Sequence, residues 1–535
     1  MDHTNHPGAA RPLIPLPSLG TNLALFAGLV VTAGLPPVPW TGALVPLGLA
    51  LLFGVLAGAA KPARTAWFFA LAHQGSLLHW LFLLDPSKSI PTRALVPIQA
   101  SAAILYVSLF YLLLGWVFGR VRRRIGSERA LLLLPVLWTA MEALRAKGEL
   151  AFSWCLAGSA TIGTPLMGLA RTSGEIGLGA GMALLAVAVV LLWRRRGSGP
   201  VGTPVLITGL ILAAGWWTVL AVGSFVVVPS DRSTGKSASL AVAAIQADVA
   251  LADKWVDAKI DSTLIPYGAL TAAAAADGAE FVVWAETAVP DYLRHRKPLL
   301  DWARAVVTGA EVYLYTGFPD ADRGLDGKVR TYNSSGLFAP DGSLIDRYAK
   351  YHLLPIGEAM PFTRYISALA KLDVGQAEWT PGSKPVPMTA AWPGREFHFS
   401  GLICFESIFS HLGRAAVRDG SQALVVITND GWFGKSAGPL QHAAMARMRA
   451  VENGVPVIRC ANNGVSFICD GRGRILDSLG LGRRGVVAAD IVPGGGQTLY
   501  VRYGAWPVGG YLILGAAVVL LAPPLRRRRQ GGGPS

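Results

Sequence analysis

The sequence predicts a bundle of about eight membrane-spanning α-helices joined to a separate α/β domain. Hydrophobic residues make up 52% of the 535 residues and charged residues only 15%, whereas soluble domains carry about 25% charged residues. Apolar segments long enough to cross a bilayer fill the first part of the chain and recur once near its end. Between them, short β-rich runs alternate with helical stretches, which is the pattern of an α/β fold.

A membrane-spanning helix needs about 20 consecutive apolar residues, and several segments come close to that length. These segments are 18–36, 40–60, 65–84, 95–118, 130–146, 174–193, 203–228 and 505–524. Glu175 lies close to the start of the sixth segment. Because a charged side chain inside a bilayer is costly unless it is paired or near the surface, we expect Glu175 and the preceding Arg171 at the outer interface, without a catalytic role.

The chain carries a net charge of +15, and its basic residues gather in short clusters between the apolar segments. The clusters follow the second, fourth, sixth and eighth segments: Lys61 and Arg64; Arg120 and Arg122 to Arg124; Arg194 to Arg196; and Arg526 to Arg529. With eight spans, all of these clusters fall on one side of the membrane. The positive-inside rule then places both termini in the cytoplasm and the long segment 229–504 outside. Because the clusters reflect topology, we expect no nucleic-acid partner.

Three regions follow from this topology: 1–230 as a bundle of seven spans, 236–496 as an extracytoplasmic α/β domain, and 500–535 as a final span with a basic cytoplasmic tail. In the middle region, strands are expected at 240–246, 281–285, 312–317, 331–339, 397–404, 423–428, 455–461 and 465–469, and helices at 253–276, 296–309 and 439–453. Asp341-Gly342 and Asn463-Gly464 predict two-residue hairpin turns, because both central positions of such turns favour positive φ.

The four cysteines, Cys155, Cys404, Cys460 and Cys469, show neither CxxC spacing nor histidines at the spacing of zinc ligands. We therefore predict no metal site. Cys460 and Cys469 could meet in a hairpin, but we interpret both as small buried hydrophobic residues. The sequence also has no Walker A loop and no dinucleotide-binding fingerprint, so no cofactor is expected.

Three reactive side chains each follow a strand-like run. Glu286 ends the apolar run 281–285, and Lys350 follows a strand-like stretch and leads into an apolar one. Cys404 ends another apolar run with a helix expected after it, which is the geometry of a nucleophile on a strand-to-helix turn. The N–H groups of that helix would lower the pKa of the thiol and could bind an oxyanion. Taken singly, each residue also has a plainer interpretation: an exposed acid, a solvated lysine and a buried, inert cysteine.

Together, the order Glu286, Lys350, Cys404, each at the end of a strand, resembles the carbon–nitrogen hydrolase (nitrilase) superfamily. With the membrane segments added, the chain resembles the apolipoprotein N-acyltransferase family over nearly its whole length. Further motifs that carry this resemblance lie at 429–434 (NDGWFG), 438–442 (GPLQH), 445–450 (MARMRA), 462–464 (NNG) and 503–506 (YGAW). Two positions depart from the family pattern: Phe405 stands where a tyrosine is common, and Ala505 replaces a common acidic residue.

The resemblance implies a nitrilase-like αββα sandwich and a two-step acyl transfer without a cofactor. Cys404 would attack the ester of a phospholipid, typically phosphatidylethanolamine, to give a thioester and a lysophospholipid. The α-amine of the N-terminal diacylglyceryl-cysteine of an apolipoprotein would then take the acyl chain. Glu286 would act as the base, and Lys350 would stabilise the oxyanion and the thiolate.

Supporting residues follow from the same resemblance. Glu358 would orient Lys350 or assist proton transfer, Glu406 would shape the same network, and Phe405 would adjust the acyl pocket. Three aromatic residues are candidate substrate or lid contacts: Trp255, Trp432 and Phe433. The last two lie in a glycine-rich stretch that could form a mobile lid, although interfacial anchoring or core packing explains such aromatics equally well.

Both substrates carry acyl chains, and exposing each CH₂ to water costs about 0.8 kcal/mol, so the site is expected at the outer leaflet, reached sideways through the bundle. The resemblance implies a monomer in the bacterial cytoplasmic (inner) membrane, with phospholipid, apolipoproteins and membrane lipids as partners. The alternative is a membrane-tethered nitrilase-type amidase in which water takes the acyl group, although eight spans would be excessive for a tether. The intact Glu–Lys–Cys set and the lack of a charged path through the apolar segments disfavour a non-enzymatic scaffold or transporter.

Overall fold

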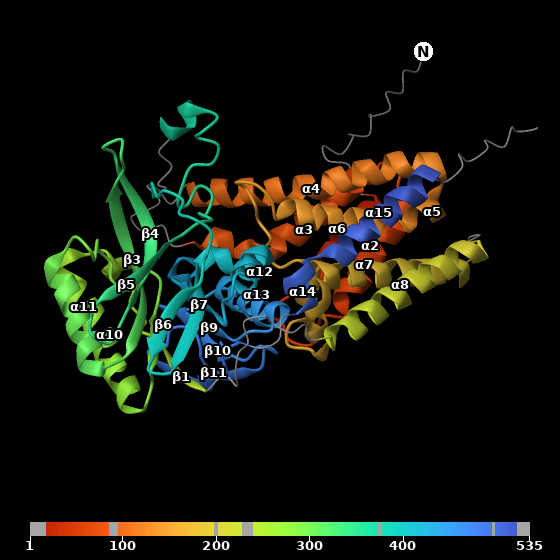
Figure 1. The fold of residues 1–535 in the computed structure, drawn as a ribbon. Coiled ribbons are helices and arrows are strands. Elements are labelled where there is room, and N and C mark those ends of the chain that lie inside the picture. Colours follow the sequence, from red (N-terminus) through yellow and green to blue (C-terminus); the bar gives the residue numbers. More distant parts are fainter. Residues whose placement is uncertain are drawn as a thin grey trace, which may run out of the picture.

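The computed structural model describes residues 18–84, 95–196, 202–226, 239–371, 377–494 and 498–521. An elongated helical bundle carries the α/β domain at one of its ends (Figure 1). The chain leaves the bundle after α8 (Thr203–Ser224), forms the α/β domain, and returns along the bundle through α15 (Trp506–Leu521).

The helices of the bundle follow the predicted apolar segments. In chain order they are α1 (Leu19–Ala33), α2 (Leu44–Gly58), α3 (Pro62–Leu77), α4 (Leu95–Ile125), α6 (Leu134–Arg145), α7 (Ala170–Arg196), α8 and α15. Within the described part of the chain, three segments are long and apolar enough to cross a membrane, namely Leu95–Ile125, Pro165–Arg196 and Thr203–Ser224, and α1 and α2 are shorter apolar helices. α6 has only 12 residues, which is about 18 Å of helix against about 30 Å of hydrocarbon core. The count of eight spans therefore stays a prediction.

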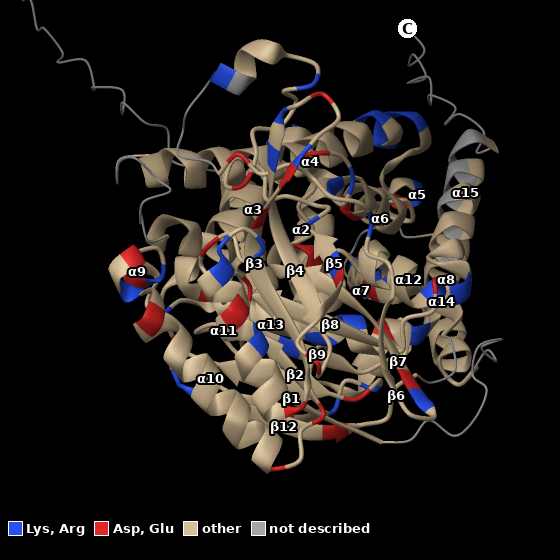
Figure 2. Ribbon diagram, turned by 60° about the vertical axis from the view of Figure 1, so that its left-hand side comes forward, with Lys and Arg blue, Asp and Glu red and all other residues tan. Residues whose placement is uncertain are grey.

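The described basic clusters include one at the end of the bundle farthest from the α/β domain. The guanidinium of Arg122, near the end of α4, donates to three backbone carbonyls between Leu56 and Ala59, at the end of α2. The short helix α5 (Ser127–Leu131) follows α4 at this far end (Figure 1), and Figure 2 shows Lys and Arg beside it. Arg526 to Arg529 and residues 522–524 of the last predicted span lie outside the described residues.

The α/β domain contains two six-stranded sheets, with strand orders β12-β1-β2-β3-β4-β5 and β11-β10-β9-β8-β7-β6. The strands are β1 (Leu240–Gln246), β2 (Phe281–Trp284), β3 (Tyr313–Arg323), β4 (Val329–Phe338), β5 (Leu344–Ala349), β6 (Met388–Trp392), β7 (Arg395–Ile403), β8 (Ala423–Thr428), β9 (Val457–Ala461), β10 (Ser466–Cys469), β11 (Ile475–Leu479) and β12 (Gly485–Ile491). β1, β2 and β3 run parallel, as do β7, β8 and β9. β5 is antiparallel to β4, which is antiparallel to β3, so β5 runs in the same direction as β2.

Helices cover the outer face of each sheet, and the inner faces pack on each other. α10 (Ile260–Ala276) and α11 (Lys297–Ala310) cover the first sheet, whereas α12 (Ser410–Arg418) and α13 (Ala437–Asn453) lie between the second sheet and the bundle (Figure 1). Between the sheets, the rings of Phe281 and Phe399 are 5.0 Å apart. Because both faces of β2 are covered, all its residues are buried, which explains its continuous apolar sequence.

Two predicted hairpins are present, β4–β5 and β9–β10, but the predicted turn type was wrong. Of the four central residues only Gly342 has a positive φ, at 81°. Its N–H donates to the carbonyl of Ala339 over 2.8 Å, so the β4–β5 loop is a longer turn that ends in a left-handed glycine. The sequence also did not predict β6, β11 or β12. Cys460 and Cys469 are buried free thiols, as predicted, and Cys155 is also a buried free thiol.

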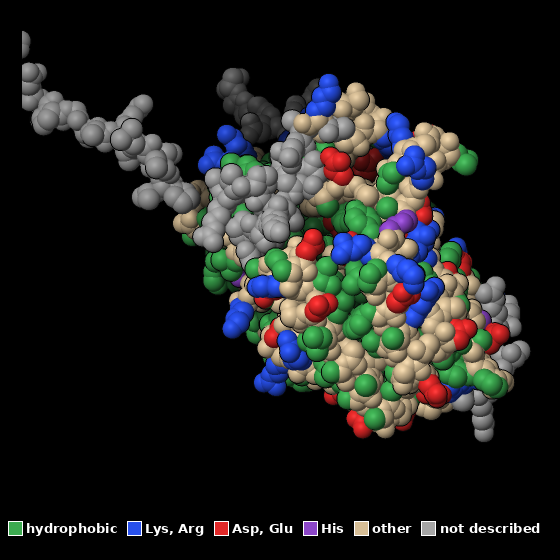
Figure 3. All heavy atoms as spheres, turned by 90° about the vertical axis from the view of Figure 1, so that its left-hand side faces the viewer, with side chains coloured by type: hydrophobic (Ala, Val, Ile, Leu, Met, Phe, Trp, Pro, Cys, Tyr) green, Lys and Arg blue, Asp and Glu red, His purple; other side chains and the backbone are tan. Residues whose placement is uncertain are grey.

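On the face shown in Figure 3, Lys and Arg are interspersed with Asp and Glu.

A buried ion pair joins the bundle to the α/β domain. The carboxylate of Glu175, near the start of α7, lies 2.7 Å from Nη2 of Arg449 on α13. Glu175 is 1% exposed and lies inside the junction, where the ion pair offsets its burial. The preceding Gly174 has a φ of 73°, and a Cβ there would meet the ring of Tyr500 at 2.6 Å. Only glycine fits this bend at the start of α7.

An aromatic cluster also joins the bundle to the α/β domain. Oε1 of Gln441, on α13, accepts from the indole N–H groups of Trp80 and Trp154 over 3.1 and 2.7 Å. The ring of Phe433 packs 4.8 Å from Trp80 and 6.0 Å from Trp154. Residues from the bundle and from the α/β domain therefore share one packed junction.

Candidate active site

The predicted nucleophile lies at a sharp turn. β7 ends at Ile403, and the chain enters a short 3₁₀-helix, η6 (Cys404–Ile408), before α12. Cys404 itself has a φ of 53°, a left-handed conformation that costs a residue with a side chain roughly 1–2 kcal/mol. Backbone strain of this kind is concentrated at functional sites, and the strand-to-helix turn predicted from the sequence is confirmed.

Glu286 follows β2 and is fixed by donors from two other strands. Its Oε1 accepts from Nδ2 of Asn333 over 2.8 Å, and its Oε2 accepts from the backbone N–H of Asn429 over 2.9 Å. The backbone carbonyl of Glu286 accepts from Nζ of Lys254 over 2.8 Å. The carboxylate is therefore held in one orientation from both of its oxygens.

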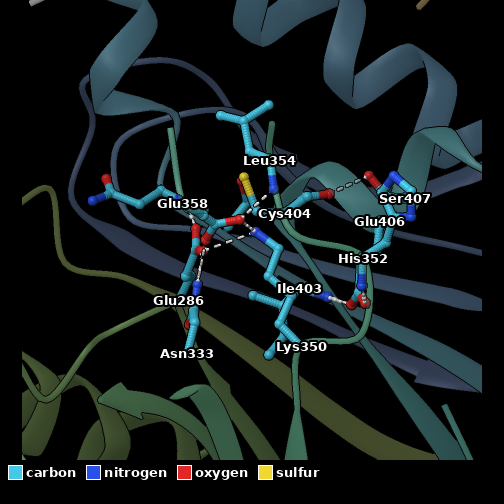
Figure 4. A network of polar contacts seen from close by, with 12 residues as sticks. Glu286, Asn333, Lys350, His352, Leu354, Glu358, Ile403, Cys404, Glu406 and Ser407 are labelled. Atoms are coloured by element: carbon cyan, nitrogen blue, oxygen red, sulfur yellow. Dashed lines mark hydrogen bonds and ion pairs between the residues drawn. The ribbon is translucent and has the colours of Figure 1, made fainter. Parts of the chain in front are cut away.

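Lys350 follows β5, which runs in the same direction as β2, so the two strands end at the same edge of the first sheet. Nζ of Lys350 lies 2.7 Å from Oε2 of Glu358 and 3.7 Å from Oε1 of Glu286. Asn333 also donates to Oε1 of Glu358 over 2.9 Å, which bridges the two carboxylates. Figure 4 shows these side chains and the sulfur of Cys404 converging on one space. The structure thus brings the three predicted catalytic residues together with Glu358.

The electrostatics of the site keep the lysine charged and the thiol neutral. Burial alone would lower the pKa of Lys350, but Glu358 and Glu286 raise it above its ordinary value. Burial and then the charge of Glu286 raise the pKa of the Cys404 thiol far above its usual range, and Lys350 only partly opposes them. The sequence-based expectation of a lowered thiol pKa was wrong, because desolvation of the half-buried thiol and the charge of Glu286 outweigh the opposing charge of Lys350. A neutral thiol requires a base when it attacks.

Glu406 organises the two turns that carry Lys350 and Cys404. Its Oε1 accepts from the hydroxyl of Tyr348 over 2.6 Å and from the backbone N–H groups of Tyr351 and His352 over 2.9 and 3.0 Å. Its Oε2 accepts from the N–H of Ile403 over 2.7 Å. Glu406 thereby ties the chain after β5 to the chain before the nucleophile (Figure 4).

An aromatic wall lies beside the nucleophile. The ring of Phe405 is 6.0 Å from Phe152 of the bundle, 6.0 Å from His352 and 5.2 Å from Phe409. Burial and the charge of Lys350 lower the pKa of His352 to about 4. The imidazole is therefore neutral near pH 7, and the wall carries no net charge.

The three predicted lid or substrate aromatics are half-buried. Phe433 ends a short 3₁₀-helix, η7 (Asp430–Phe433), and packs into the junction described above. Trp432 precedes it, and Trp255 follows α9 (Leu251–Lys254). Phe433 therefore packs in the junction, which was the alternative to a lid contact. A lid role for the glycine-rich loop that contains it stays a prediction.

The sequence analysis gave several residues of the site no role, although one of them, Asn429, begins the motif at 429–434. Asn333 and Asn429 are buried and hold Glu286, and Lys254 is 1% exposed beside it. No sequence signal distinguishes Asn333, because its strand, VRTYNSSGLF, contains several other polar residues. Lys254 directly precedes the singled-out Trp255, but nothing in the sequence distinguishes it from a surface lysine.

Lys254 leads to a prediction about stability. Burial lowers the pKa of Lys254 from its ordinary value of 10.5 to about 7, with Glu286 and Cys404 opposing. Between these two values the unfolded chain binds the proton and the folded protein does not, so this lysine makes the folded protein more stable as the pH rises. We expect the unfolding midpoint of the wild type to rise relative to that of Lys254→Met between pH 6.5 and pH 9.5.

Thermal unfolding in detergent micelles measures this difference. The exposed lysine in Lys384→Met serves as the control, and its difference from the wild type should not change with pH. A constant difference between wild type and Lys254→Met over the same range would contradict the prediction.

Comparisons with known proteins agree with the geometry. A family model described as "Carbon-nitrogen hydrolase" matches residues 241–499, and one described as "Apolipoprotein N-acyltransferase N-terminal domain" matches residues 27–188. The apolipoprotein N-acyltransferase of Azotobacter vinelandii is 33% identical over 509 residues, which cover 92% of this chain and 93% of the relative. That of Geobacter metallireducens is 32% identical over 502 residues, which cover 90% of this chain and 92% of the relative.

A crystal structure of an amidase from Nesterenkonia sp. aligns with 53% of this chain and 99% of the amidase at 19% identity, with a TM-score of 0.37. The identity to full-length relatives, together with a family model for each of the two parts, identifies the protein as an acyltransferase. The chain belongs to the apolipoprotein N-acyltransferase family.

Proposed function

We propose that the protein transfers a fatty acyl chain from a phospholipid, typically phosphatidylethanolamine, to the α-amine of the N-terminal diacylglyceryl-cysteine of apolipoproteins. The acyl chain passes through a thioester on Cys404. The observation that carries this proposal is the convergence of Glu286 and Lys350 on a strained cysteine at the end of a strand. The names of the full-length relatives support the acceptor class.

In the first step, Glu286 takes the proton of the Cys404 thiol as the sulfur attacks the ester carbonyl. The ammonium of Lys350 and N–H groups at the start of η6 stabilise the oxyanion of the tetrahedral intermediate. When the intermediate collapses, the carbon–oxygen bond of the ester breaks. The lysophospholipid leaves with the proton held by Glu286, and the acyl chain remains on sulfur as a thioester.

In the second step, the α-amine of the acceptor attacks the thioester carbonyl, and Glu286 takes a proton from the nitrogen. Lys350 again faces the oxyanion. The carbon–sulfur bond breaks, the thiolate regains the proton from Glu286, and the product is an amide. Glu358 keeps the ammonium of Lys350 in place during both steps, because it lies 2.7 Å from Nζ.

The position of the site suits substrates that remain in a bilayer. Phe405 beside the nucleophile packs on Phe152 of the bundle, so an acyl chain can lie against both parts. Moving its CH₂ groups into water would cost about 0.8 kcal/mol each. We assign residues 1–230 to seven spans, 236–496 to the domain outside the bacterial inner membrane and 500–535 to the last span, and expect a monomer. The basic end of the bundle supports this orientation through the positive-inside rule.

Intact mass of the purified protein after incubation with phosphatidylethanolamine tests the proposal. We expect a fatty-acyl mass increment on the wild type, absent from Cys404→Ala, and discharged by a peptide that begins with diacylglyceryl-cysteine. The competing reading is a membrane-tethered amidase, in which water takes the acyl group. Absence of any adduct, together with rapid hydrolysis of small amides, would overturn the acyltransferase proposal in favour of that amidase.

A further inference from the structure

A chain of buried polar groups ends on the backbone of the nucleophile. His442, on α13, places Nε2 3.0 Å from the carbonyl oxygen of Cys404 and 2.9 Å from Oγ of Ser407. Oγ of Ser407 donates to the same carbonyl over 2.9 Å (Figure 4). Because a carbonyl oxygen only accepts, Nε2 of His442 carries the hydrogen of its bond to Cys404. Two donors therefore hold one peptide oxygen.

In a neutral imidazole with its hydrogen on Nε2, Nδ1 is the acceptor, and Nη2 of Arg459 is the donor that faces it. Nδ1 of His442 lies 2.9 Å from Oδ1 of Asp430 and 3.2 Å from Nη2 of Arg459. Nη2 of Arg459 also donates to Oδ2 of Asp430 over 2.7 Å, and the hydroxyl of Thr428 donates to its Oδ1 over 2.9 Å. Each of these four residues is at most 1% exposed. Burying such polar and charged side chains costs free energy unless they are hydrogen-bonded. In this network the hydrogen bonds lead to the carbonyl oxygen of Cys404.

The same helix holds both ends of the nucleophile turn. Arg449 lies seven residues after His442 on α13, close to the same helix face, and its Nη1 donates to the carbonyl of Ile408 over 3.1 Å. The hydroxyl of Ser153, from the bundle, donates to the same carbonyl over 3.1 Å. The carbonyls at the first and last residues of η6 are thus both fixed from outside the turn.

The fixed oxygen determines where a neighbouring N–H points. In a trans peptide the C=O and the N–H point in opposite directions, so holding the Cys404 oxygen sets the direction of the Phe405 N–H. Phe405 is the second residue of η6, and N–H groups at the start of a helix have no partner within it. Donors on the oxygen of a peptide also strengthen its N–H as a donor.

We propose that His442, backed by Arg459 and Asp430, is a positioning residue for acyl transfer. It fixes and polarises the peptide between Cys404 and Phe405, so that the Phe405 N–H faces the oxyanion of the tetrahedral intermediate. This inference rests on the proposed function, because it assigns a donor to the oxyanion formed in that reaction.

Two reactions of the same thiol separate this role from general packing. Acylation by phospholipid passes through an oxyanion, whereas alkylation by iodoacetamide displaces iodide directly and forms none. Removing one oxyanion donor lowers kcat by about 10²–10³-fold, and for the misaligned donor in His442→Ala we expect a loss of about 10- to 100-fold in thioester formation. The KM for phosphatidylethanolamine and the rate of alkylation should stay within about threefold of the wild type.

A second variant and a control complete the experiment. The side-chain amide in His442→Gln can still donate to the Cys404 carbonyl and should recover part of the acylation rate; it also carries the test if His442→Ala does not fold. His398→Ala changes a histidine farther back along β7, outside this network, and should match the wild type in both reactions.

Wild-type acylation in a folded His442→Ala protein would overturn the inference, as would an equal loss of acylation and alkylation. Wild-type acylation would show that His442 has no role in acyl transfer. Equal losses in the two reactions would show that His442 only supports the packing around the thiol. Failure of the proposed function is seen separately, because the wild type would then form no thioester with phospholipid in the same assay.

Discussion

Lys350→Met is expected to slow thioester formation by about 10³-fold or more, since losing one preorganised charge at an oxyanion costs about 10²–10³-fold by itself. A second effect adds to this loss. Lys350 is the cation that opposes the rise in the pKa of Cys404, so the thiol becomes still harder to ionise. Without the ammonium, the carboxylates of Glu286 and Glu358 face each other across Asn333. Their like charges then repel each other across the site.

Single-turnover acylation, followed by intact mass, measures this effect. The methionine is close to lysine in length and fits the 1%-exposed site, so the fold should survive. Lys328→Met removes an exposed lysine from the β3–β4 loop and should leave the rate unchanged. A rate for Lys350→Met within about tenfold of the wild type would show that the oxyanion is stabilised elsewhere, contrary to the magnitude expected for a preorganised charge.

Arg449→Met is expected to destabilise the protein by about 3–5 kcal/mol, the range for removing one partner of a buried ion pair. Arg449 is fully buried, with Nη2 2.7 Å from Glu175 and Nε 3.0 Å from Glu452. Burial raises the pKa of Glu452 to about 7 even though Arg449 opposes it. Without the guanidinium, the folded protein binds protons more tightly than the unfolded chain, so stability falls as the pH rises. The loss should therefore be larger at pH 8 than at pH 5.5.

Unfolding in detergent micelles at the two pH values tests this prediction. Arg447→Met, two residues earlier on α13, removes a half-buried arginine whose hydrogen bond goes to the carbonyl of Gly473, and it should cost about 1 kcal/mol or less. Adding Glu175→Gln and Glu452→Gln to Arg449→Met should recover part of the loss. A loss in unfolding free energy below about 1 kcal/mol for Arg449→Met, independent of pH, would contradict the prediction. It would mean that Glu175 and Glu452 do not remain buried without a cation in the variant.

The sequence was most informative where a strand is buried on both faces. β1 and β8 coincide with the predicted ranges, and the residues after β2, β5 and β7 were singled out because an apolar run ends at a reactive side chain. β11 and β12 were missed because their exposure varies along the strand and charged residues interrupt them, so they lack the continuous apolar pattern.

The residues that hold the triad could not be found in this way. The fold brings together Asn333 from a strand, Asn429 and Asp430 from the turn after β8, and His442 from a helix. The last three lie in the motifs at 429–434 and 438–442, but no local pattern gave them a role. The direction of the pKa shift of Cys404 depends on how the protein encloses the sulfur, which no local pattern records. Likewise, the partner of Glu175 lies far along the chain at Arg449, so the sequence could state that a partner was needed but could not name it.

The junction around Gln441 has a consequence for protein production. Its side chain joins Trp80 and Trp154 through Oε1, and its amide nitrogen donates to the carbonyl of Pro36 over 3.2 Å. A truncated protein that begins at β1 would lack these partners of α13 and would also lack Glu175. Arg449 would then be exposed to solvent. Although the sheets look like a self-contained enzyme, a soluble fragment of this kind is a poor route to activity, and biochemical work should keep the two parts on one chain.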